Sequence, residues 1–157
     1  MTRLQTGDTA PDFTLPDTGG AAVSLAAVRA AADKGVVVYF YPRAGTPGCT
    51  TEACDFRDNL ASLAGAGYAV VGVSADPVEA IRAFAEAEHL TFPLLSDADH
   101  AVADVYGAWG PKTFDGRTFD GVHRCTFVVE RDGTLRSAEY DVEATGHVAA
   151  LRAALGA

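Results

Sequence analysis

Residues 35–41 form a continuous apolar, β-branched and aromatic run that stops at Pro42. Such a run is typical of a strand buried on both faces of a sheet, and these strands occur where helices cover both faces. A turn at residues 46–48 follows, and apolar residues then recur at helical spacing until Gly65 and Gly67 end the pattern. The sequence therefore predicts a central strand, a loop and a helix, which is the repeating unit of an α/β fold.

The rest of the chain continues this alternation. We expect strands at residues 10–15, 23–25, 68–74, 92–95, 124–130 and 135–140, and helices at residues 78–88, 101–106 and 147–155. Turn signals at residues 17–20 and 131–134 predict an opening hairpin that covers the core and a closing hairpin. Asp76 is expected to cap the helix whose first turn carries Pro77. Together these elements predict a central mixed β-sheet flanked by helices.

Residues 107–121 show the weakest sequence pattern for a helix or a strand in the chain. They are rich in glycine, aspartate and aromatic residues and show no periodicity. We expect a loop here, long enough to suspect a functional role, and a disordered insertion is the alternative.

Length and charge narrow the classes of function. A chain of 157 residues, 48% of them hydrophobic, fits one domain spanning residues 1–157. The net charge of −9, with twelve scattered lysines and arginines, argues against a nucleic-acid partner. No apolar run approaches the ~20 residues that span a bilayer, and no secretory signal is recognisable. We therefore expect no membrane partner and a cytoplasmic location.

Three cysteines are too few for the disulfide framework of a small secreted protein. In a reducing compartment they are buried, metal-bound or reactive. The four histidines are dispersed and lack the spacing of metal ligands, so we expect neither a metal nor another cofactor.

Cys49 occupies the most informative position among the three. It falls in the first turn of a helix that begins at the carboxyl end of a buried strand, where ligand sites of α/β sheets collect. Free backbone N–H groups and the positive end of the helix dipole stabilise a thiolate there. Thr46 can bring its hydroxyl round the turn to the sulfur, while Pro42 can shield one side of it from water. The alternative is an ordinary buried cysteine, which the Pro-Gly turn and the helix start argue against.

Cys54 follows Cys49 by five residues in the same predicted helix. At that spacing the two Cα atoms of an intact helix lie ~8.6 Å apart, whereas disulfides rarely exceed ~7 Å. A bridge between them therefore requires the first turns of the helix to unwind. The alternative for Cys54 is a small apolar residue inside the helix, and the spacing is neither a thioredoxin CxxC nor a zinc knuckle.

Pro42, Thr46 and Cys49 belong to a series of ordered motifs that runs along nearly the whole chain and resembles the peroxiredoxin family. The pattern PxxxTxxC is met at Pro42, Thr46 and Cys49, and the longer string TPGCTTEAC is similar to the subgroup called bacterioferritin comigratory protein or peroxiredoxin Q. Further matches are residues 10–13, 40–42, 72–74, 94–97, 106–110 and 123–124. The resemblance implies a thioredoxin-like fold.

The resemblance also assigns roles that spacing alone does not. It implies that Cys49 is the peroxidatic cysteine, that Thr46 and Arg124 orient the peroxide and support the thiolate, and that Cys54 is the resolving cysteine. It further implies reduction of the disulfide by thioredoxin and a monomer or weak dimer. Glu52 occupies a position where, by the same resemblance, a polar or acidic residue commonly lies near the site. The alternative is a first-turn acid that complements the helix dipole, and we do not expect Glu52 to be catalytic.

Cys125 departs from the family pattern. If Arg124 points to the active site, strand alternation sends Cys125 to the opposite face, so we expect a buried, inert thiol. A second resolving cysteine is the alternative.

The sequence thus predicts a thiol peroxidase that reduces hydrogen peroxide or organic hydroperoxides, with a thioredoxin-type dithiol as partner and a role in antioxidant defence. A rival hypothesis is a redox-switched sensor or holdase without significant turnover. A second rival, a general thiol-disulfide oxidoreductase, is disfavoured by the lack of a CxxC motif.

Overall fold

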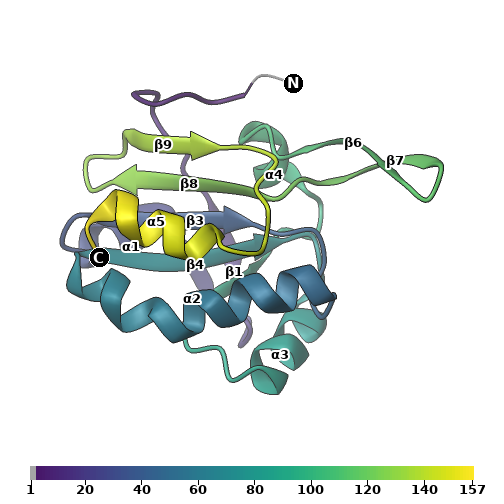
Figure 1. Cartoon of the computed structure of the whole chain (residues 1–157), viewed down its shortest axis with the longest axis horizontal. Helices are drawn as coiled ribbons and strands as arrows, with labels where there is room; N and C mark the ends of the chain where they lie inside the picture. Colours follow the sequence, from purple (N-terminus) through teal and green to yellow (C-terminus); the bar gives the residue numbers. More distant parts are fainter. Residues whose placement is uncertain (1–2) are drawn as a thin grey trace.

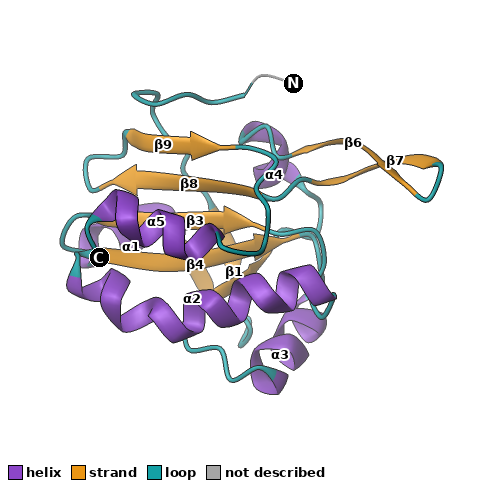
Figure 2. Ribbon diagram, viewed as in Figure 1, coloured by secondary structure: helices purple, strands orange, loops and turns teal. Residues whose placement is uncertain are grey.

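The computed structural model describes residues 3–157, which build a central five-stranded sheet with helices on both faces (Figures 1 and 2). The strands of this sheet are β3 (Gly35–Phe40), β4 (Tyr68–Ser74), β5 (Leu94–Ser96), β8 (Cys125–Glu130) and β9 (Leu135–Glu139). Their order is β5-β4-β3-β8-β9. Strands β3, β4 and β5 are parallel, whereas β8 is antiparallel to β3 and β9 to β8. The predicted mixed sheet is confirmed.

Two hairpins stand outside the central sheet. β1 (Thr14–Pro16) pairs with β2 (Ala22–Ser24), and β6 (Trp109–Phe114) pairs with β7 (Arg117–Val122). The helices are α1 (Leu25–Ala31), α2 (Pro47–Gly65), α3 (Val78–Ala87), α4 (Ala101–Val105) and α5 (His147–Leu155). Helices α2, α3 and α5 lie on one face of the sheet, and α1 and α4 on the other (Figure 1).

The central strand β3 divides the core, as its apolar run predicts. All of its residues are buried, and they alternate between two hydrophobic clusters. Val36, Val38 and Phe40 pack in the cluster on the α1 and α4 face. Val37 and Tyr39 pack in the cluster under α2, α3 and α5. Burial of both faces of β3 fixes its register, because a slip of one residue would exchange the two faces.

The sequence-based prediction is wrong for residues 107–121. Instead of a loop, the chain forms the β6–β7 hairpin, which projects from the body of the molecule (Figure 1). Its turn contains Asp115 and Gly116, which both have positive φ (53° and 73°), as tight hairpin turns require. The strands escaped prediction because a projecting two-stranded ribbon is solvated on both faces and lacks the alternation of a half-buried strand.

Two local predictions also need correction. Helix α1 was not predicted; Ser24 caps it by accepting a hydrogen bond from the backbone N–H of Ala27 at 3.1 Å. Asp76 does not cap α3, whose N-cap residue is Pro77. The Asp76 carboxylate instead accepts hydrogen bonds from the Ala44 N–H at 2.7 Å and the Ser74 hydroxyl at 2.9 Å. It therefore ties the loop after β3 to the end of β4.

Candidate active site

Cys49 lies in the first turn of α2, directly beyond the carboxyl end of β3, and its side chain is 1% exposed. The helix begins here because Thr46 has the extended backbone of an N-cap residue (φ −77°, ψ 155°) and Pro47 follows at the first helical position. Thr46 makes no side-chain capping bond, so its hydroxyl does not occupy the free N–H groups of the first turn. Those groups and the helix dipole favour negative charge near Cys49.

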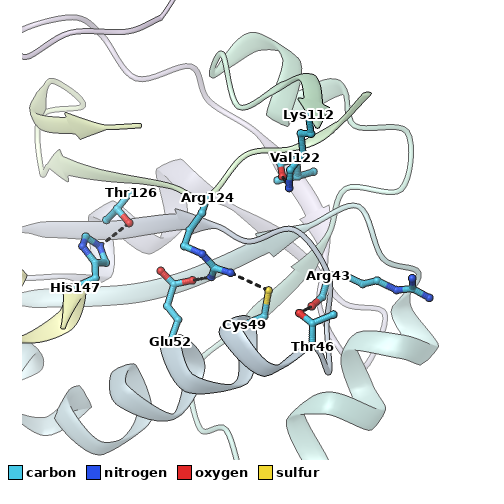
Figure 3. A network of polar contacts seen from close by, with 9 residues as sticks. All are labelled: Arg43, Thr46, Cys49, Glu52, Lys112, Val122, Arg124, Thr126 and His147. Carbon is cyan, nitrogen blue, oxygen red and sulfur yellow. Dashed lines mark hydrogen bonds and ion pairs between the residues drawn. The ribbon is translucent and has the colours of Figure 1, made fainter. Parts of the chain in front are cut away.

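The Thr46 hydroxyl donates instead to the backbone carbonyl of Arg43, at 2.8 Å (Figure 3). Because its hydrogen is used in this bond, the Thr46 hydroxyl oxygen remains available as a hydrogen-bond acceptor. Pro42 is partly buried where the chain leaves β3. Its predicted shielding of the sulfur stays a prediction.

Arg124 directly precedes β8 and reaches Cys49 from a distant part of the sequence (Figure 3). Its Nη2 donates to the Cys49 Sγ at 3.4 Å, and its Nη1 donates to Glu52 Oε1 at 2.5 Å. A Cβ atom on Gly48 would lie 3.2 Å from the same Nη2, so the glycine leaves the guanidinium the room it needs. One guanidinium thus bridges a thiol and a carboxylate on the same helix, as its planar fork of donors allows.

Glu52 lies beside Cys49, near the site as the family resemblance implies. Its side chain is 0% exposed, and one oxygen pairs with Arg124, a partner that the sequence did not indicate. Burial raises the pKa of Glu52 from 4.5 to about 7, although Arg124 acts in the opposite direction. The i, i+3 spacing of Cys49 and Glu52 places both on one face of α2, and this spacing was the available signal.

The comparisons with known proteins agree with this geometry. The family described as AhpC/TSA matches residues 6–138. The chain belongs to this family. Peroxiredoxin Bcp of Escherichia coli is 46% identical over 147 residues, which cover 94% of this chain and 92% of that protein.

Solved structures give the same assignment. Peroxidoxin BcpB of Mycobacterium tuberculosis superposes with a TM-score of 0.86 at 37% identity, covering 98% of this chain and 97% of that one. The bacterioferritin comigratory protein of Xanthomonas campestris is described for its alkyl peroxide reduction activity. It superposes with a TM-score of 0.83 at 35% identity, covering 92% of this chain and 90% of that one. The chain is therefore a peroxiredoxin of the bacterioferritin comigratory protein group, with the thioredoxin-like fold and the thiol peroxidase activity of that family.

In this peroxiredoxin Cys54 lies on α2 with Cys49, and both are free thiols in an intact helix. Cys54 is partly exposed, and burial raises its pKa while Arg57 opposes the shift. Since a helix holds Cα atoms five residues apart at ~8.6 Å, a disulfide requires the segment that contains Glu52 to unwind.

Cys125 is 0% exposed and packs in the cluster on the α1 and α4 face, away from α2. Burial raises the pKa of its thiol to about 12, and the thiol is therefore protonated at neutral pH. Its burial and its place opposite Arg124 are as predicted.

Within residues 3–157, no group of three or more histidine, cysteine or acidic side chains could hold a metal ion. In the same part of the chain, no helix combines the length and the apolar character needed to cross a bilayer.

The buried Glu52 should make stability fall as the pH rises. Between pH 4.5 and about pH 7 the folded protein holds a proton on Glu52 that the unfolded chain releases. The contribution of this proton to the free energy of unfolding is therefore complete below pH 4.5 and is lost as the pH rises past about 7. Relative to Glu52→Gln, the free energy of unfolding of the wild type should drop by on the order of 2 kcal/mol between about pH 5 and about pH 8. Urea unfolding at both pH values measures this difference. The exposed Glu79→Gln is the control, and a wild-type/Glu52→Gln difference that does not change with pH contradicts the prediction.

Proposed function

We propose that this peroxiredoxin reduces hydrogen peroxide and organic hydroperoxides through Cys49, with Cys54 as the resolving cysteine. The Cys49 thiolate attacks one peroxide oxygen, the O–O bond breaks, and the leaving oxygen takes a proton to give water or an alcohol. The resulting sulfenic acid condenses with the Cys54 thiol, which forms the disulfide and releases water. A thioredoxin-type dithiol then exchanges with the disulfide and restores both thiols.

The observation that carries this proposal is the Arg124 guanidinium 3.4 Å from the Cys49 sulfur. A cation at this place stabilises the thiolate, and it also stabilises the negative charge that develops on the leaving oxygen. The alkyl peroxide reduction described for the Xanthomonas campestris relative supports organic hydroperoxides as substrates. Recycling by a dithiol requires a reducing compartment, so we place the protein in the cytoplasm. The resemblance to the subgroup leads us to propose a monomer or weak dimer.

The rival functions predict different chemistry. A sensor or holdase would be oxidised once and would not turn over, whereas a general thiol-disulfide oxidoreductase would exchange disulfides without peroxide. Multiple-turnover consumption of peroxide with thioredoxin, thioredoxin reductase and NADPH separates them, since only a peroxidase couples NADPH oxidation to peroxide. Oxidation that stops after one equivalent of peroxide would overturn the proposal.

Cys54→Ser should slow this turnover by at least about tenfold, because the sulfenic acid on Cys49 then lacks its intramolecular thiol. The wild type should also lose helical circular dichroism on oxidation, as the start of α2 unwinds, whereas Cys54→Ser should keep it. Trapping with dimedone and mass spectrometry should find the sulfenic acid accumulated in the variant.

Cys125→Ala is the matched control and should behave as the wild type, since Cys125 is buried on the other face of the sheet. If Cys54→Ser turns over at the wild-type rate, the resolving role passes to Cys125 or to an external thiol.

A further inference from the structure

Lys112 brings a second positive charge toward the active site. It lies on β6 of the projecting hairpin, yet its Nζ donates to the carbonyl of Val122 at the end of β7, at 2.9 Å. Its stem passes Gly121, where a Cβ atom would lie 3.1 Å from the Lys112 Cδ. The glycine therefore lets the side chain lie along β7, so that the ammonium is held at the root of the hairpin near Arg124 and not at its tip.

The ammonium lies beside the part of the chain that carries Arg124, because Val122, whose carbonyl it contacts, comes two residues before Arg124. In Figure 3 it is directed from the hairpin toward the side on which Arg124 and Cys49 lie. Burial lowers the pKa of Lys112; the charge of Arg124 acts in the same direction, and Cys49 acts in the opposite one. Together with the contact of Arg124 to the Cys49 sulfur at 3.4 Å, the contact to Val122 puts the ammonium on the Arg124 side of the site.

Lys112 has no anionic partner within the described residues 3–157. None of the ion pairs found there includes it, although the chain carries a net charge of −9. Arg124, by contrast, already donates hydrogen bonds to Glu52 and Cys49. The Lys112 ammonium has three N–H donors and uses one on Val122, which leaves two for an incoming group. A half-buried cation with free donors is stabilised when an anion approaches it.

We propose that Lys112 binds the carboxylate of hydroperoxide substrates and makes this peroxiredoxin selective for hydroperoxides that carry a negative charge. The inference rests on the proposed peroxidase function. A cation beside the site attracts the carboxylate of such a substrate and helps to orient its O–O bond toward Cys49. Hydrogen peroxide and neutral alkyl hydroperoxides offer no group for this contact.

The test compares 6-hydroperoxyhexanoate with its methyl ester, which lacks the negative charge and is larger by one methyl group. Rapid quenching and mass spectrometry of Cys49 give the rate constant of its oxidation, independently of any reductant. Lys112→Met should lower the ratio of the rate constant for the carboxylate to that for the ester about fivefold. This is the effect expected from the loss of one partly exposed contact between charges. Lys112→Arg should keep the ratio nearer to that of the wild type, because the charge is retained.

Arg117→Met is the matched control, since it removes an exposed cation from the same hairpin near its tip and should leave the ratio unchanged. A ratio unaffected by Lys112→Met overturns the assignment. Failure of the proposed function looks different, because Cys49 of the wild type would then react with neither probe.

A measurement on the wild type covers the case in which the variants fold poorly. Raising the ionic strength from about 0.01 to about 1 M shortens the Debye length from about 30 to about 3 Å. The carboxylate/ester ratio of the wild type should fall over this range, and a ratio that does not respond to salt overturns the proposal.

Discussion

Cys49→Ser is expected to lower peroxide turnover by at least about a thousandfold, because a serine hydroxyl is not ionised at neutral pH and the nucleophile is lost. The substitution keeps the size of the side chain, and the Arg124 guanidinium remains beside it. Binding of the peroxide is therefore retained while the chemical step disappears. The coupled NADPH assay with hydrogen peroxide measures the loss.

Two controls are needed to show that the loss of turnover comes from the missing thiol. The Cys49 side chain is buried in the cluster under α2, so the thermal unfolding midpoint must show that the variant is folded. Cys125→Ala, which also removes a buried thiol, should retain turnover. Turnover that survives Cys49→Ser would move the nucleophile to another cysteine and would remove the basis of the proposed cycle.

The sequence predicts the half of the site that is local in the chain. The apolar run of β3, the turn with Pro47 and the helical spacing of α2 are consecutive, so short-range rules suffice to put Cys49 at the start of a helix. They also lead to the conclusion that Cys49 and Cys54 can form a disulfide only if α2 unwinds. The structure has both as free thiols in one continuous helix.

The other half of the site depends on tertiary structure. Arg124 is 75 residues from Cys49, and only the family resemblance brought them together before the fold was known. The pairing of Glu52 with Arg124 was not predicted, because the dipole of a helix explains an acid in its first turns without any partner. Lys112 was not predicted to approach the site, since residues 107–121 were interpreted as a loop. In each case the missing information is which strand lies beside which helix.

Arg124→Met should reduce the rate of Cys49 oxidation by about a hundredfold or more. This is the usual effect of removing one preorganised hydrogen-bond donor from the atom on which negative charge develops in the transition state. At about pH 8, above the pKa of Glu52, it should also destabilise the protein by about 3 kcal/mol or more, because the buried carboxyl group then lacks the cation that compensates its charge. Stopped-flow oxidation by hydrogen peroxide and urea unfolding measure the two effects separately.

The double variant Arg124→Met with Glu52→Gln decides whether the two effects have different origins. Glutamine removes the buried carboxyl group, so much of the lost stability should return. The rate should not return, because neither side chain supplies a cation to the sulfur and the leaving oxygen. A rate that recovers with stability would mean that Arg124 acts only by holding α2 in place, and the electrostatic role inferred from its 3.4 Å contact with Cys49 would be wrong. A stability that does not recover would show instead that the Glu52 carboxyl group is not the source of the destabilisation.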